Sequence, residues 1–339
     1  CLVGSEMCIR DRLLNGISYL ISGISARGIG GVNYGRVIFP LLVGAIAVYF
    51  LKKEKKMKRT ELLNGLGYEI PALAKIRLFL DTDAKNEADD QYAIMHFLLT
   101  PMVDILGIGA AHFEKKAKTG HSMDDSYQEI EKLLGLAKID DVKAYKGARM
   151  PLNEANVEEN AASLKIIEEA KKGHLYVVCL GSLTNVASAL VLDPSITSNL
   201  TVIFNGGGPY PLGRAEFNLM QDLKASRIIF ESNVEIWQIP QDVYASLEVS
   251  LASLRENVYP AGEIGKYLFE ELVECNLREF NPNFKLRAGE NWTLGDNAAI
   301  GPILMNQYRD NFTIISSPAI SDEGLYLNCL LYTSDAADE

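Results

Sequence analysis

Cysteine is scarce in this chain and is not arranged in pairs. The 339 residues include five cysteines and no Cys-x-x-Cys pair. The sequence therefore offers neither a disulfide framework nor the ligand spacing of a structural zinc site. Cys179 lies in an apolar segment typical of a buried strand, and we expect it to be a thiol of the core.

The usual short catalytic and phosphate-binding motifs are also missing. None of the four histidines has His-Glu-x-x-His spacing, and there is no Gly-x-Ser-x-Gly elbow. No dinucleotide-binding or P-loop glycine motif follows a predicted strand. The three glycines at 206–208 lack the lysine and the helix that phosphate binding needs. These absences argue against zinc peptidase, α/β-hydrolase and P-loop chemistry.

Positive charge is in deficit. The formal net charge is −11, while the 48% apolar and 23% charged residues are ordinary for a globular protein. An acidic chain is a poor partner for nucleic acid or for an anionic membrane surface. We therefore expect a small-molecule partner rather than a nucleic acid or a membrane.

A long membrane-spanning run is absent as well. The uncharged segment 37–51 is shorter than the roughly 20 residues that a spanning helix needs, and lysines follow it. It could be a short anchor with its basic flank inside, or a signal-type segment without a small-residue cleavage site. It could also be upstream sequence translated in frame before a natural start at Met57, which we favour.

The two ends differ in character from the rest of the chain. Residues 1–12, CLVGSEMCIRDR, and 329–339, CLLYTSDAADE, resemble translated sequencing-adapter read-through from a bacterial metagenome. We set them aside as scars and regard 13–56 as an uncertain apolar and basic lead. The expected domain is 57–328, truncated at its C-terminus.

Apolar strand-like segments alternate with amphipathic helical patterns along this domain. The predicted strands are 75–83, 103–111, 142–145, 174–180, 200–205 and 234–239, with late candidates at 312–316 and 324–327. The predicted helices are 89–99, 122–136, 158–172, 186–192, 222–231, 263–280 and 296–305. This alternation predicts an α/β fold with an open, mostly parallel sheet and helices on both faces.

One aspartate-rich stretch, LFLDTDAKNEADDQYA at 78–93, carries most of the chemical information. Asp81 and Asp83 end the first strand, and Asp89 and Asp90 open the next helix. Ligands of open α/β sheets bind at this edge. Four carboxylates gathered there repel one another unless a hard cation lies between them. Helix capping is an alternative explanation for the later pair, but it does not explain the first.

Other stretches join this one in a family resemblance. DTDAKNEADD resembles the DxDxxxDD opening of the inosine–uridine-preferring nucleoside hydrolases. The other matching stretches, in family order, are KGARMPL at 146–152, GSLTN at 181–185, AEFN at 215–218, LGDNAA at 294–299 and SDEGLY at 321–326. The resemblance covers residues 75–328 and implies the Rossmann-like nucleoside hydrolase fold.

The resemblance implies a Ca²⁺ site. Its side-chain ligands would be Asp83, Asp90 and Asp296, and the backbone carbonyl of Leu180 would be a further ligand. Asp81 would orient these ligands without touching the ion.

The resemblance also implies the reaction, which is hydrolysis of the N-glycosidic bond of ribonucleosides to free base and ribose. Asp83 would take a proton from the water that attacks the anomeric carbon. Asp89 would bind the ribose 2′-hydroxyl, and Glu216 and Asn218 would bind the other hydroxyls.

The chain departs from the family pattern at four places. The loop between the aspartate pairs is longer than the common form. Gly295 stands where many members have a histidine that protonates the leaving base, and Tyr210 stands where an asparagine is usual. His112 or Glu114 stands where another asparagine is common. We expect His112, Glu114 and Tyr210 to contact the substrate.

Two hypotheses concern the leaving base. Trp292 could stack on it, or His112 could protonate it as the leaving-group acid. The alternative for Trp292 is an ordinary half-buried aromatic residue.

Two other functions compete with the hydrolase. The departures at Gly295 and Tyr210 would suit a nucleoside- or sugar-binding protein that has lost turnover. A Mg²⁺-dependent phosphohydrolase could use Lys85 or Arg214 for the phosphate, but it would leave AEFN unexplained. We expect a cytoplasmic homo-oligomer, a dimer or a tetramer, that acts on nucleosides.

Overall fold

A six-stranded parallel sheet forms the centre of the molecule. The computed structural model describes residues 57–64, 75–152, 157–278, 290–304 and 312–327. The sheet strands are β1 (Ile76–Thr82), β2 (Val103–Ala110), β3 (Ala144–Lys146), β4 (Leu175–Cys179), β5 (Leu200–Asn205) and β6 (Glu235–Ile239). Their spatial order is β3-β2-β1-β4-β5-β6, and each neighbouring pair is parallel. The predicted α/β fold with a parallel sheet is confirmed.

The strand order creates a crevice at the carboxyl ends of the two central strands, β1 and β4. The chain runs from β1 outward to β3 and then returns to place β4 beside β1. The connections on either side of this pair therefore diverge, which leaves a ligand site at the carboxyl ends of β1 and β4.

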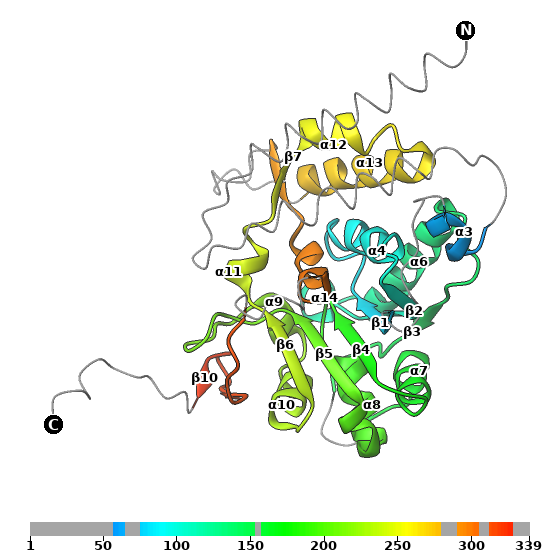
Figure 1. The fold of residues 1–339 in the computed structure, drawn as a ribbon. Helices are drawn as coiled ribbons and strands as arrows, with labels where there is room; N and C mark the ends of the chain where they lie inside the picture. The colour runs from blue at the N-terminus through cyan, green and yellow to red at the C-terminus, as the bar shows by residue number, and fades with distance from the viewer. Residues whose placement is uncertain (1–56, 65–74, 153–156, 279–289, 305–311, 328–339) are drawn as a thin grey trace, which may run out of the picture.

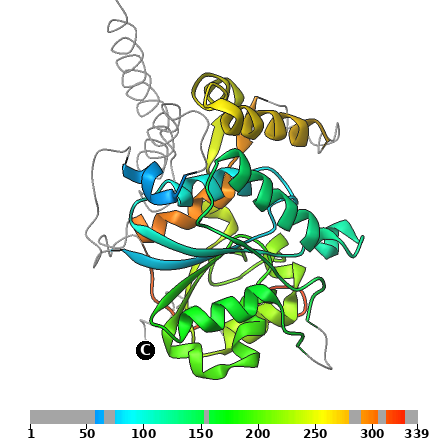
Figure 2. The same cartoon turned by 90° about the vertical axis from the view of Figure 1, so that its right-hand side faces the viewer.

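Helices cover both faces of the sheet, as Figures 1 and 2 show. The helices of one face are α4 (Asp90–Leu98) and α6 (Ser122–Leu136), with α13 (Gly262–Arg278) packed against α6 farther from the sheet. Those of the other face are α7 (Ala161–Ala170), α8 (Thr184–Leu192) and α10 (Leu223–Glu231). Each set packs around its own apolar cluster. Cys179 is buried in the second cluster, as expected of a core thiol.

Shorter elements were not predicted from the sequence. They are α3 (Arg59–Asn64), α5 (Glu114–Ala117), η2 (Pro194–Asn199), α9 (Phe217–Gln221), α11 (Gln241–Tyr244), β7 (Glu248–Ser250), α12 (Leu251–Asn257) and β8 (Asn291–Thr293). Strands β7 and β8 form an antiparallel pair outside the main sheet. Elements this short carry too few residues for a periodic signal.

The structure corrects the late strand candidate 312–316 and contains a strand within the other candidate, 324–327. Residues 312–316 form no strand, and Ile314 is 87% exposed. Their β-branched side chains favour extended backbone, but that preference produces a strand only where a partner is available. The strand pair is instead β9 (Ala319–Ile320) with β10 (Tyr326–Leu327), which are antiparallel. The predicted helix 296–305 is a 3₁₀ helix, η3 (Gly295–Ile300), followed by α14 (Gly301–Leu304).

The segment after Met57 is attached to the body of the domain. The Met57 amide donates to the Lys138 carbonyl at 2.8 Å. Arg59 donates to the carbonyls of Leu98 at 2.7 Å and Thr100 at 2.6 Å, at the end of α4. No helix among the described residues is long and apolar enough to cross a membrane. The apolar run 37–51 lies outside those residues.

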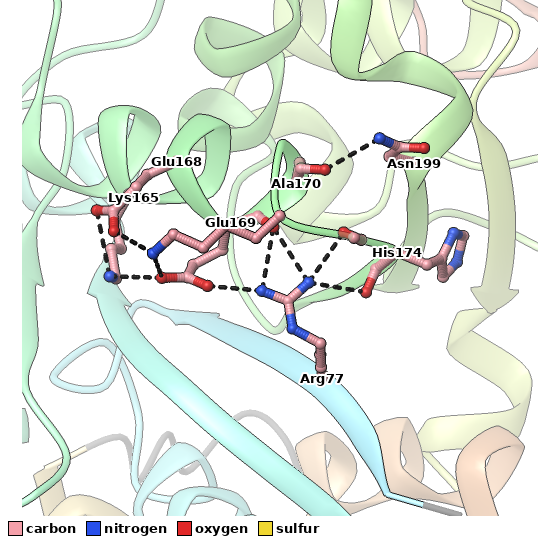
Figure 3. A network of polar contacts seen from close by, with 9 residues as sticks. Arg77, Lys165, Glu168, Glu169, Ala170, His174 and Asn199 are labelled. Atoms are coloured by element: carbon pink, nitrogen blue, oxygen red, sulfur yellow. Dashed lines mark hydrogen bonds and ion pairs between the residues drawn. The ribbon is translucent and has the colours of Figure 1, made fainter. Parts of the chain in front are cut away.

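A charged network joins the start of β1 to α7, as Figure 3 shows. Arg77 donates to the Glu169 carboxylate at 2.6 Å and to the Gly173 carbonyl at 2.9 Å. Lys165 and Lys172 donate to the other oxygen of Glu169 at 2.7 and 2.8 Å. Burial alone would raise the pKa of Glu169, but the two lysine hydrogen bonds outweigh it and lower that pKa to about 2.

We predict that Glu169→Gln lowers stability by roughly 2 kcal/mol at pH 7. The folded pKa of Glu169 lies below its ordinary value, so this contribution is complete above about pH 4.5 and is lost as pH falls toward 2. Denaturant unfolding at pH 7 and pH 3 measures the difference. The matched control is Glu168→Gln, since Glu168 binds the same lysines but is 52% exposed. Equal losses in both variants would contradict the prediction.

Candidate active site

The aspartates predicted from the sequence come together at the carboxyl ends of β1 and β4. Asp81 lies within β1, Asp83 follows it, and Asp90 is the first residue of α4. Leu180 follows β4 directly, and Asp296 enters from η3. The site therefore lies at the crevice that the strand order creates.

Asp81 lies beneath the other acids and is fully buried. Its Oδ1 accepts a hydrogen bond from Asn185 Nδ2 at 2.9 Å, while its Oδ2 has no partner. Burial raises the pKa of Asp81 to about 7, and the Asn185 hydrogen bond opposes that shift. A Cβ at position 109 would lie 2.4 Å from Asp81 Oδ1, so only the glycine present there leaves room for the carboxylate.

Asp83 is buried beside the turn after β4. A Cβ at Gly181 would lie 2.8 Å from Asp83 Cγ. The backbone that follows Leu180 therefore packs directly against this carboxylate. Burial and the charges of Asp90 and Asp89 hold the pKa of Asp83 well above its usual range. Among the residues that the structure describes, its Oδ2 has no hydrogen-bond partner, which leaves it available to a ligand.

Asp89, Asp90 and Asp296 form the tightest acidic group. One carboxylate oxygen from each lies within 4.8 Å of the others. The Asp296 amide donates to Asp89 Oδ2 at 3.2 Å, and Asn205 Nδ2 donates to Asp296 Oδ1 at 2.8 Å. Asp90 Oδ1 accepts from the Thr82 hydroxyl.

A capping hydrogen bond does not explain Asp89, the first of the later aspartate pair. Asp89 occupies the N-cap position of α4 but makes no capping hydrogen bond, because its carboxylate turns to Asp296. The capping alternative is therefore wrong for Asp89. Burial is the main cause that raises the pKa of each acid in the site, to about 6 for Asp90.

The donor set fits a hard cation. Four acids repel one another, three of them buried and Asp89 partly buried. Among the described residues Asp83 Oδ2 has no partner, and the neutral donors Thr82 and Asn205 orient two of the other carboxylates. Carboxylate oxygens and a backbone carbonyl are the ligands that Ca²⁺ and Mg²⁺ prefer. The geometry identifies an oxygen-ligand cation site without selecting the metal.

The AEFN stretch lies against this acidic group. Glu216 caps α9, and its Oε2 accepts from the amides of Gly207 at 2.7 Å and Leu219 at 3.0 Å. Asn218 Nδ2 donates to the Leu180 carbonyl at 2.6 Å and to the Asn205 carbonyl at 2.9 Å. The structure thus brings Asn218 to the carbonyl expected at the metal and fixes Glu216 at the start of the same short helix.

Comparison with known proteins agrees with this arrangement. A sequence profile described as inosine-uridine preferring nucleoside hydrolase matches residues 78–317. The chain belongs to this nucleoside hydrolase family. Membership makes the protein a hydrolase that acts on N-glycosyl compounds.

Curated relatives carry names from the same family. The chain is 26% identical over 242 residues to the pyrimidine-specific ribonucleoside hydrolase RihB of Escherichia coli O1:K1, and the match covers 64% of this chain and 75% of that protein. RihB of Escherichia fergusonii matches with the same identity and coverage.

Solved structures share the nucleoside hydrolase fold. The purine-preferring ribonucleoside hydrolase from Gardnerella vaginalis has a TM-score of 0.59 at 20% identity, and the match covers 73% of this chain and 85% of that one. The effector protein XopQ, solved with adenosine diphosphate ribose, has a TM-score of 0.57 at 12% identity, with 79% and 91% covered. At these identities the similarity concerns the fold alone.

Within this nucleoside hydrolase, His112 is held as a structural link. Its Nε2 lies 2.8 Å from Thr184 Oγ1, and the Thr184 hydroxyl lies 2.8 Å from Asp222 Oδ2. Since an ionised carboxylate only accepts, Thr184 donates to Asp222 and His112 Nε2 donates to Thr184. Burial lowers the pKa of His112 to about 4, which leaves the ring neutral at pH 7. This geometry weakens its case as the leaving-group acid.

The other residues expected to recognise the base lie in different settings. Glu114 accepts from the amides of Gly120 at 2.9 Å and Ser122 at 2.8 Å and so closes the turn before α6. Tyr210 is 41% exposed, whereas Trp292 is 7% exposed within the apolar core. The burial of Trp292 agrees with an ordinary packed aromatic residue. The substrate contacts of these side chains stay predictions.

Several functional neighbours were missed from the sequence. Thr82, Asn185 and Asn205 each donate to a site aspartate, and Tyr244 donates to Glu216. Three of them stood in recognisable places: Thr82 between two aspartates, Asn185 in GSLTN and Asn205 at the end of a strand. Tyr244 has no local signal, because it lies in the four-residue helix α11, outside every motif noted in the sequence.

We predict that Asp296→Asn raises the unfolding temperature in the presence of chelator, because one of several repelling buried carboxylates becomes neutral. Excess Ca²⁺ should then stabilise the parent protein, by about 2.7 kcal/mol at a hundred times the dissociation constant, but not the variant. Thermal melts with CaCl₂ and with chelator measure both effects. The control is the exposed Asp125→Asn, which should follow the parent.

The cation effect should also depend on pH. Burial raises the pKa of Asp90 to about 6. Protons therefore compete with the cation below this pH, and the Ca²⁺-induced shift in unfolding temperature should shrink between pH 7 and pH 5. A shift of constant size across that range would contradict the assigned ligands.

Proposed function

We propose that the protein hydrolyses the N-glycosidic bond of ribonucleosides in a Ca²⁺-dependent reaction, giving free base and ribose. The observation that carries this proposal is the group of Asp89, Asp90 and Asp296 at the β1–β4 crevice, with Asn218 of AEFN bound to the Leu180 carbonyl at the end of β4. A cation site beside polar groups suited to a sugar is what such a reaction needs.

Asp83, Asp90, Asp296 and the Leu180 carbonyl would hold the Ca²⁺. All four offer oxygen, and the raised pKa values of the three acids reflect the burial and repulsion that a cation would relieve. When bound, the ion would lower the pKa of a water molecule and help to orient the ribose. Asp81 supports the site from below through Asn185.

The side chains of the protein would do the remaining work. Asp83 Oδ2 is buried and without a partner, so it can accept a proton from the attacking water. Asp89, Glu216 and Asn218 would bind the ribose hydroxyls. Asp89 also belongs to the tightest acidic group, so ribose and cation would be held side by side. This proximity would supply much of the rate.

The charged residues nearby do not favour the phosphohydrolase alternative. Lys85 Nζ lies 2.5 Å from Glu271 Oε1 and 3.5 Å from Glu129 Oε2, so its charge is already paired. Arg214 donates to Gln241 at 2.8 Å. Neither cation is directed at the acidic group by these contacts, so neither is placed to bind a phosphate held there.

We predict Ca²⁺-dependent release of ribose from at least one of inosine, guanosine, adenosine, uridine and cytidine. Asp83→Asn should lower kcat by roughly 10²–10⁴-fold, the usual contribution of a general base. A reducing-sugar assay measures release with Ca²⁺ and with chelator, and Asp125→Asn is the control that should retain activity. The panel also ranks the bases.

Failure would be informative as well. Ca²⁺ that raises the unfolding temperature, together with nucleosides that bind and are never cleaved, would support a binding protein instead. Release that persists in chelator would reject the metal-dependent part of the proposal.

A further prediction separates the two roles of His112. An acid for the leaving base matters for inosine but not for 4-nitrophenyl riboside, whose leaving group needs no proton. Because His112 Nε2 is engaged by Thr184, we predict that His112→Gln changes kcat/KM for both substrates by the same factor. A loss confined to inosine would restore the leaving-group acid hypothesis.

A further inference from the structure

We propose that Tyr244 is a positioning residue for Glu216, and that position 295 is glycine because the Tyr244 ring needs that space. This inference rests on the proposed function, in which Glu216 binds the ribose. It concerns a residue outside the motifs that identified the family.

The Glu216 carboxylate is held from two sides. Its Oε2 is fixed by two backbone amides, at Gly207 and Leu219. Its Oε1 accepts from the Tyr244 hydroxyl at 2.7 Å. Among the described residues, Tyr244 is the only side-chain donor recorded to this oxygen. The two amide contacts fix Oε2, so the Tyr244 hydroxyl is the contact that sets the orientation of the Glu216 carboxylate.

Tyr244 also reaches the acidic group. Burial raises the pKa of Tyr244, and the charges of Glu216, Asp296 and Asp89 raise it further, so these carboxylates lie close to the phenol. The hydroxyl remains protonated and can only donate to Glu216. Tyr244 ends α11, whose first amide, at Gln241, donates to the Gly207 carbonyl at 3.0 Å. The residue thus bridges the predicted ribose and metal halves of the site.

Gly295 provides the space for this bridge. A Cβ at position 295 would lie 3.0 Å from Tyr244 Cδ2 and 3.4 Å from Asp89 Oδ2. A contact of 3.0 Å would require the ring to shift by a few tenths of an ångström. Such a shift would change the position of its hydroxyl relative to Glu216. The backbone of Gly295 is not in the left-handed region, so the glycine is explained by the ring and not by its own conformation.

The first test removes only the hydroxyl. Asp83→Asn serves as the parent because its turnover is expected to be roughly 10²–10⁴-fold slower, and Tyr244→Phe is added to it at a Ca²⁺ concentration shown by titration to saturate the parent. Calorimetry should show about ten-fold weaker binding of the best nucleoside of the panel, the usual effect of losing a hydrogen bond to a charged group. Ca²⁺ affinity should not change. Tyr127→Phe, a partly buried tyrosine of α6, is the matched control.

The same substitution has a kinetic signature in the active enzyme. An orienting contact to ribose that exists in both ground and transition states affects KM more than kcat. Tyr244→Phe should therefore raise KM about ten-fold with a smaller change in kcat. A merely structural role would instead reduce the active fraction and leave KM unchanged.

The second test measures coupling between the ring and the glycine. Gly295→Ala should weaken nucleoside binding several-fold when Tyr244 is present and have little further effect in a Tyr244→Ala background. Gly135→Ala is the control, since a Cβ there meets nothing within 4 Å. Additive effects of the two substitutions would overturn the role assigned to Gly295.

These outcomes distinguish the inference from the proposed function. If the wild type releases no ribose but nucleosides still bind, the proposed function fails and the Tyr244 comparison remains decisive. If Tyr244→Phe binds nucleoside as tightly as its parent, the inference is wrong even though hydrolysis is established. If no nucleoside binds to the Ca²⁺-loaded protein, Glu216 does not serve a ribose and the inference falls as well.

Discussion

Repulsion among buried carboxylates is the constraint on which the rest of the site depends. Burial and mutual charge keep the acids of the β1–β4 crevice far from their ordinary pKa values. Their nearest donors are neutral, such as Thr82, Asn185 and Asn205. Neutral donors orient a carboxylate without cancelling its charge. Lys85, which could have cancelled it, is paired with Glu271 on α13. The negative charge is therefore left for a ligand, and a divalent cation satisfies it most simply.

The parallel sheet makes this concentration of charge possible. Reversal of the strand order beside β1 places the ends of β1, β4 and β5 next to one another, so that residues from separate parts of the chain converge. Close approach is the second requirement. Gly109 and Gly181 give the Asp81 and Asp83 carboxylates room that any side chain would occupy. The energy that holds the charges together comes from the apolar clusters on both faces, which fix the strands independently of the site.

Much of the fold could be predicted from the sequence because the periodic segments are long and consistent. Strands such as β4 and β5 are short apolar runs buried on both faces, and α6 is amphipathic over its full length. The incorrect predictions lie in segments where hydrophobic periodicity carries little information. Residues 312–316 have strand-like side chains without a partner strand. The β7–β8 pair is too short to register as a period, although it brings Trp292 into the core.

The sequence by itself determined the α/β class, the position of the acids and the family, because these depend on local periodicity and on motifs of a few residues. Only the tertiary structure decided which groups meet. It placed the Asp89 carboxylate with Asp90 and Asp296 instead of on the amides of its own helix, tied His112 to Thr184, and brought Tyr244 to Glu216. These contacts join residues far apart in the chain. Their geometry depends on how helices and turns pack around the sheet, and no local pattern encodes it.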